Sequence, residues 1–128
     1  MNRLQFFVKT LTIYSVHSPS LYALCEGALR ARLSRRARHH LHSRYSRVVY
    51  KLCCYSHAEP HKLAPGLTQI GDTNPIVVVD RPHSSTQNEA RWRDLKADSR
   101  YRVAIDTYRY GLLLTDPRLH RQQLLLMI

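Results

Sequence analysis

The segment from Gly27 to His57 contains no aspartate or glutamate, although it carries the densest run of cations in the chain. Five arginines fall within nine positions, and three histidines follow them: Arg30, Arg32, Arg35, Arg36, Arg38, His39, His40 and His42. Burying an uncompensated guanidinium is costly, so these side chains must lie in water or against an anionic partner. The core of this protein must therefore come from the apolar residues around them.

The positive charge belongs to the N-terminal half of the 128-residue chain. Residues 1–58 carry ten Lys and Arg against one acid, whereas residues 59–128 carry ten against eight. Such asymmetry is typical of proteins that contact nucleic acid or anionic membranes, and of targeting sequences. Because clustered guanidinium groups attract phosphate in any fold, we predict a protein that binds a polyanion, with RNA or DNA favoured over an anionic membrane.

Composition divides the chain into three parts. Residues 1–58 form the basic region, residues 59–75 form a connection rich in Pro and Gly, and residues 76–128 form a small α/β region. The apolar fraction of 44% is ordinary for a globular protein. We predict a small α+β domain with mixed short strands and two to three helices, whose N-terminal half is poorly ordered.

The N-terminus has the composition of a targeting segment. Arg3 and Lys9 accompany several hydroxyl residues, and no acid precedes Glu26. This combination is typical of mitochondrial presequences, so a mitochondrially imported small protein is one interpretation. An ordinary first strand explains the same residues equally well.

Two elements are expected in the rest of the basic region. Ser18 and Pro19 suit the start of a helix, and an apolar stripe with three- and four-residue spacing continues from there to Leu41. The arginines point around most of this helix, so its second half can bury little. The segment from Arg47 to Tyr55 alternates like a strand.

The predicted nucleic-acid contacts combine cations for the phosphates with tyrosines on which bases can stack. They are Arg30, Arg32, Arg35, Arg36, Arg38, Arg44, Arg47, Lys51, Tyr45 and Tyr55. Since the arginines ring a helix, this pattern favours an electrostatic contact over the reading of bases. The alternative is a solvated basic face that only keeps the protein soluble.

Catalytic motifs are missing from the sequence. It has no GxGxxG, P-loop, HExxH or GxSxG pattern, so we predict a non-enzymatic protein without a cofactor. The best remaining active-site candidate is Asp80, which ends the apolar run Ile76–Val79 near His83, although a simple turn explains it as well. Cys54, His57 and His61 are weak metal-ligand candidates, because their spacing fits no zinc pattern.

Three further elements are expected after the connection. The pair Thr86 and Glu89 predicts a capping box that opens a helix over about Gln87–Ser99, and a strand is expected to follow over 101–107. Asp116 and Pro117 predict a final helix that ends in the apolar run Leu124–Ile128. An apolar terminus must be buried, pair with another chain or be a liability, so self-association is one interpretation.

Cysteine usage and codon bias bear on origin and location. Three cysteines do not make a secreted disulfide framework, so we expect reduced thiols in an intracellular protein, in the nucleus or the mitochondrion. Arg, Leu and Ser, which have six codons each, fill 44 positions. A recently arisen or alternative reading frame without a selected activity would produce the same excess of arginine.

Overall fold

The computed structural model describes residues 11–12 and 19–127. The candidate targeting segment, the capping residue Ser18 and the terminal Ile128 lie outside these residues. The described elements are a strand β1 (Leu11–Thr12), helix α2 (Pro19–Leu24), π-helix η2 (Cys25–Leu29), helices α3 (Arg35–His40) and α4 (Arg44–Ser56), strands β2 (Pro60–Ala64), β3 (Leu67–Ile70) and β4 (Ile76–Asp80), helix α5 (Thr86–Ala97), and strands β5 (Val103–Asp106), β6 (Tyr110–Leu114) and β7 (Gln122–Met127).

A mixed sheet forms the centre of the molecule, with the strand order β1-β7-β5-β6-β4-β3-β2. Strands β2, β3, β4, β6 and β5 pair antiparallel in that order, and β7 pairs parallel with both β5 and the short β1. Helix α5 connects β4 to β5, which run parallel with β6 between them. The predicted α+β class is confirmed.

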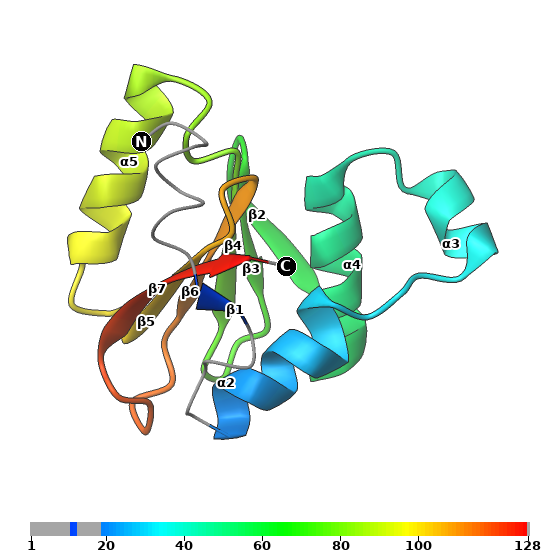
Figure 1. Ribbon diagram of the computed structural model, residues 1–128, viewed down its shortest axis with the longest axis horizontal. Helices are drawn as coiled ribbons and strands as arrows, with labels where there is room; N and C mark the ends of the chain where they lie inside the picture. The colour runs from blue at the N-terminus through cyan, green and yellow to red at the C-terminus, as the bar shows by residue number, and fades with distance from the viewer. Residues whose placement is uncertain (1–10, 13–18, 128) are drawn as a thin grey trace.

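Helices cover both faces of the sheet (Figure 1). On one face, α2, η2 and α4 pack on residues such as Val78, Ile105 and Leu112. On the other face, Trp92 of α5 packs on their strand neighbours, among them Leu113. Successive residues of the central strands thus alternate between two apolar layers, which explains why β4, β5 and β6 are apolar almost throughout.

The predicted strand over Arg47–Tyr55 is wrong, because this segment belongs to helix α4. Ser43 caps the helix: its side chain accepts a hydrogen bond from the backbone N–H of Ser46, whose hydroxyl in turn accepts from the N–H of Ser43. The buried residues of α4 are Val48 and Leu52, four positions apart. That spacing satisfies alternation and helical periodicity alike, so only the capping signal separated the two structures.

The predicted C-terminal helix is also wrong. Asp116 to Leu119 form a turn, and Leu124 to Leu126 lie in strand β7. Strand β7 lies between β1 and β5; Leu124 and Leu126 join the apolar layer on the α4 face, and Leu126 is fully buried. The apolar terminus that suggested self-association thus pairs within the chain.

The expected connection over residues 59–75 contains a β-hairpin instead, made of β2 and β3. Ala64 pairs with Leu67, which leaves Pro65 and Gly66 as the turn, and Gly66 has a φ of 70° that glycine adopts without strain. The Pro-Gly pair marked this hairpin turn and not a linker.

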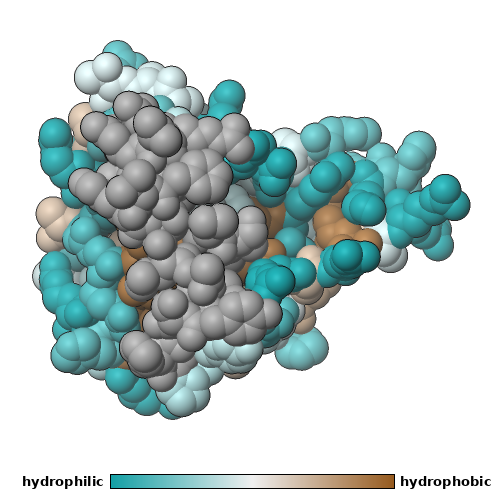
Figure 2. All heavy atoms as spheres, in the orientation of Figure 1, coloured by the Kyte–Doolittle hydropathy of each residue, from teal (hydrophilic) through white to brown (hydrophobic). Residues whose placement is uncertain are grey.

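The long helix expected from Pro19 to Leu41 is broken. It runs through α2 and η2 as far as Leu29, and α3 forms a separate helix from Arg35 to His40, in which no residue is buried. Helix α3 projects from the body of the molecule (Figure 1), and its surface is strongly hydrophilic (Figure 2). The helix after β4 and the strand β5 are confirmed, although the cap of α5 is Ser85 and not Thr86.

Candidate functional site

Helix α3 carries the centre of the arginine cluster. Arg35, Arg36 and Arg38 are exposed on it, and Ser34 caps its first turn by accepting from the N–H of Ala37. Within the described part of the chain, no carboxylate forms an ion pair with any of these three arginines or with Arg32. The helix therefore presents several uncompensated positive charges to solvent.

Other predicted contact residues hold the chain together around α4. Arg47 Nε donates to the carbonyl of Leu41 at 2.9 Å, and Lys51 Nζ donates to the carbonyls of Leu29 and Ala31 at 2.9 and 3.1 Å. Partial burial lowers the pKa of Lys51, and the charge of Arg47 lowers it further. These two cations anchor the segments before and after α3.

Three more predicted residues lie apart from α3. Arg30 pairs with Glu26 at 3.2 Å. The half-buried Tyr45 bonds its hydroxyl to Thr68, and burial raises the pKa of that phenol. Tyr55 lies more than two helical turns further along α4 and is 40% exposed. The two tyrosines therefore do not form one stacking surface.

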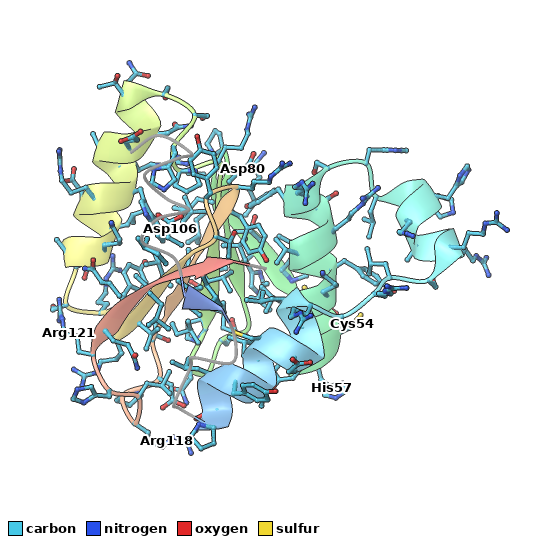
Figure 3. All side chains as sticks on the ribbon, in the orientation of Figure 1. Cys54, His57, Asp80, Asp106, Arg118 and Arg121 are labelled. Atoms are coloured by element: carbon cyan, nitrogen blue, oxygen red, sulfur yellow. The ribbon has the colours of Figure 1, made fainter. Side chains whose placement is uncertain are left out.

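A pocket of about 660 Å³ opens at the edge of the sheet where β4 ends, next to the start of α4. Figure 3 labels Asp80 at this edge and Asp106 at the end of the parallel strand β5. We call this hollow the strand-end pocket. Its lining residues are Ser43, Arg44, Tyr45, Asp80, Arg81, His83, Ser84, Tyr108 and Arg109.

Three arginines from separate segments line the strand-end pocket: Arg44 begins α4, Arg81 follows β4, and Arg109 precedes β6. Arg81 lies 3.5 Å from the carboxylate of Asp80, measured from Nε to Oδ2. Arg44 and Arg109 form no ion pair with any described residue. The pocket therefore holds more positive than negative charge.

The two loops that carry Arg81 and Arg109 have unusual backbones. Arg81 has a φ of 43° and Tyr108 a φ of 75°, values that cost energy for residues with a side chain. The N–H of Arg81 donates to the carbonyl of Arg109 at 3.1 Å, which ties the loops together. Asn88 Nδ2 of α5 also donates to the carbonyl of Arg81. Strained backbone fixed in this way is typical of functional sites.

A buried polar network lies beneath these loops. The carboxylate of Asp106, which is 3% exposed, accepts hydrogen bonds from His83 Nε2 at 2.6 Å, Trp92 Nε1 at 3.1 Å and the N–H of Tyr108 at 2.8 Å. The rings of His83 and Tyr108 stack with 5.2 Å between centroids, and Glu89 lies 3.9 Å from His83 Nδ1. The network fixes the positions of both loops.

The active-site candidates Asp80 and His83 both line the strand-end pocket. Strand alternation places Asp80 on the α4 face with Val78, whereas Asp106 follows Ala104 onto the α5 face. The two carboxylates thus point to opposite sides of the sheet, and His83 is bound to Asp106. This arrangement does not resemble a pair of carboxylates that share one proton or one substrate.

The three weak metal-ligand candidates do not come together as a metal site. Cys54 is exposed on α4, His57 ends that helix, and His61 on β2 lies 3.7 Å from Asp72. Among the residues that the structure describes, no three His, Cys, Asp or Glu side chains are grouped closely enough to hold a metal ion. Cys25, Cys53 and Cys54 are free thiols, and burial raises the pKa of Cys25 to about 11.

Sequence reasoning named Arg44 and Tyr45 but missed Arg81, Tyr108 and Arg109. The missed signal is that Asp80 and Asp106 each end an apolar strand on the two sides of a helix, as in a β-α-β unit. The carboxyl ends of such parallel strands meet at one edge, where ligands commonly bind.

Comparisons with protein-family models, with curated proteins and with solved structures gave no match to this chain. In the part of the chain that the structure describes, no helix is both long and apolar enough to cross a membrane. The surface of the protein itself therefore carries the indications of its function.

Proposed function

We propose that this protein binds nucleic acid, RNA or DNA, through its basic surface, and that it acts as a binding protein and not as an enzyme. The observation that carries the proposal is helix α3, which bears Arg35, Arg36 and Arg38 without a buried residue or an ion pair to a described carboxylate. A helix that contributes nothing to the core and concentrates one sign of charge suits a phosphate backbone.

The basic surface extends from α3 toward the body of the protein. Only Leu41 to Ser43 separate the end of α3 from Arg44, the first residue of α4. Contacts of arginine with phosphate position a nucleic acid without reading its sequence. We therefore expect broad specificity and an affinity that falls steeply with salt.

The experiment measures binding of a fluorescent 20-nucleotide single-stranded RNA and of a duplex DNA by anisotropy between 50 and 200 mM salt. The test variant is Arg35→Gln with Arg36→Gln. If each arginine contacts one phosphate, the slope of log affinity against log salt becomes shallower by about 1 to 2.

The control variant is Arg118→Gln with Arg121→Gln, which removes the same charge from exposed positions in the connection between β6 and β7, away from α3 (Figure 3). It should leave the slope close to that of the unchanged protein. Equal slopes for both variants would mean that net charge alone drives binding, and the α3 surface would be rejected. Tighter binding to anionic vesicles than to either nucleic acid would overturn the choice of partner.

A further inference from the structure

We propose that the strand-end pocket is a site for a phosphomonoester on a nucleoside, either the terminal phosphate of a nucleic acid or a mononucleotide. If the phosphate belongs to the end of a nucleic acid, this inference deepens the proposed function and rests on it. If the ligand is a mononucleotide, the inference is independent of the proposed function. The site differs from α3 because it is a hollow formed by three chain segments and not a projecting helix.

The size of the strand-end pocket fits a nucleotide. Its volume of about 660 Å³ lies within the range of about 300–1,000 Å³ that is usual for small-molecule sites. Tyr45 and Tyr108 provide aromatic rings in its lining, which suit contact with a base or sugar. A continuous nucleic-acid chain needs an open groove, but a chain end or a single nucleotide fits a pocket.

The charge of the pocket matches a phosphomonoester better than a phosphodiester. Arg44, Arg81 and Arg109 bring three positive charges, and Asp80 offsets one of them. At neutral pH a phosphomonoester carries about −1.5 to −2, whereas an internal phosphodiester carries about −1. The excess of two positive charges therefore favours the end of a chain over its interior.

The backbone adds positive potential at the same place. Helix α4 begins at the lining residue Arg44, with the lining residue Ser43 as its cap, and helix α5 begins at Thr86, two residues after the lining residue Ser84. The N-terminal end of a helix carries a partial positive charge that attracts phosphate. Two such ends reinforce the arginines.

The loops that carry Arg81 and Arg109 have a backbone conformation and hydrogen bonds that the core alone does not require. Arg81 and Tyr108 keep left-handed backbones in loops that Asp106 and Asn88 fix by hydrogen bonds. Positioning Arg81 and Arg109 before a ligand arrives lowers the entropy lost on binding. This preparation distinguishes a specific site from a region of general positive charge.

The experiment compares three forms of one 12-nucleotide RNA: 5′-phosphorylated, 3′-phosphorylated, and with hydroxyl groups at both ends. We expect one phosphorylated form to bind on the order of tenfold more tightly than the hydroxyl form, as one added charge-assisted contact would give. Adenosine 5′-monophosphate and adenosine 3′-monophosphate, added as competitors, report whether the site accepts a free nucleotide.

Variants separate the pocket from the α3 surface. Arg109→Gln, and independently Arg44→Gln, should abolish the preference for the phosphorylated end, and since both residues are exposed, neither change should prevent folding. Arg36→Gln on α3 should weaken all three RNAs equally and keep the preference. Arg121→Gln should change neither.

Each failure has its own signature. If the unchanged protein binds all three RNAs equally with a steep salt dependence, the phosphomonoester site is overturned and the proposed function stands. If Arg36→Gln removes the preference and Arg109→Gln does not, the site lies elsewhere and the inference is wrong. If neither RNA nor a mononucleotide binds, the phosphomonoester site is overturned, and the proposed function fails as well when duplex DNA also does not bind.

Discussion

Asp106 is the residue on which the strand-end pocket most depends. It is a carboxylate at the end of a fully buried strand, and three donors from separate elements converge on its two oxygens: His83 Nε2, Trp92 Nε1 and the N–H of Tyr108. A buried charge is tolerable only when hydrogen bonds satisfy it. The carboxylate links the floor of the pocket to helix α5.

We predict that Asp106→Asn destabilises the protein. An amide has one accepting oxygen where the carboxylate has two, so one buried donor must lose its acceptor and meet an NH₂ group. The expected loss is about 1–3 kcal/mol in the free energy of unfolding, measured by urea titration. Asp94→Asn is the matched control, because Asp94 is 78% exposed and should change stability by less than about 0.5 kcal/mol. Equal losses in the two variants would show that the network contributes nothing.

From the sequence, Asp80 and His83 can be placed at a strand end, and the β-α-β order of elements can place Asp106 at the end of the next parallel strand, but the burial of Asp106 cannot be predicted. In one dimension Asp106 is an acid at the edge of an alternating strand, and nothing marks it as buried. Its role appears only when helix α5 brings Trp92, which lies 14 residues earlier in the chain, into hydrogen-bond contact with it. Residues that act through such long-range contacts leave no local signal.

At the scale of elements, the predictions of helices and strands were correct where several local signals agreed. The strand at Ile76–Asp80 has β-branched residues and a flanking Pro, and helix α5 has a cap and helix-forming residues. The predictions were wrong where one sequence pattern is compatible with two structures. Val48 and Leu52 fit a strand or a helix, and Leu124–Leu126 fit a buried strand or a buried helix. Only pairing with β1 and β5 decides the second case.

The packing of α5 on the sheet depends on one glycine of strand β6. A Cβ atom at Gly111 would lie 2.4 Å from Cη2 and 2.6 Å from Cζ3 of Trp92, whose ring is fully buried. The tryptophan ring packs on strand β6 at Gly111, and its Nε1 donates a hydrogen bond to Asp106. Any side chain at position 111 must therefore move the helix or the strand.

We predict that Gly111→Ala destabilises the protein by about 1–3 kcal/mol, as overpacking of a core typically does. Gly27→Ala is the comparison, since its Cβ would meet the ring of Tyr55 at 2.6 Å, but that ring is 40% exposed and can swing aside. Alanine in place of a helical glycine also stabilises a helix by about 0.5–1 kcal/mol. Thermal melts of the two variants check the contrast, and a larger loss for Gly27→Ala would contradict it.

At the scale of the whole molecule, the arginine excess has two readings. It forms a projecting basic helix and a lined pocket, which suit a phosphate-bearing partner, but codon bias in an unselected frame would also supply arginine. A selected fold differs from an unselected one in cooperativity, because mutually consistent contacts give one transition between two states. Both apolar layers of this protein are built on the same strands, so unfolding of the sheet exposes both layers at once.

We predict that the protein unfolds in one cooperative transition. Trp92, the single tryptophan, is buried between α5 and β6 and reports the α5 layer through its fluorescence, while far-ultraviolet circular dichroism reports all helices, most of which lie on the other face. The two signals should follow one urea curve, with a slope of about 1–3 kcal/mol per M.

Saturating RNA should raise the melting temperature, because a ligand that binds the folded state stabilises it. At an RNA concentration of one hundred times Kd, the free energy of unfolding should rise by about 2.7 kcal/mol. Broad or separate transitions that RNA does not shift would instead favour a chain without a selected structure, and the proposed binding surface and pocket would then be rejected.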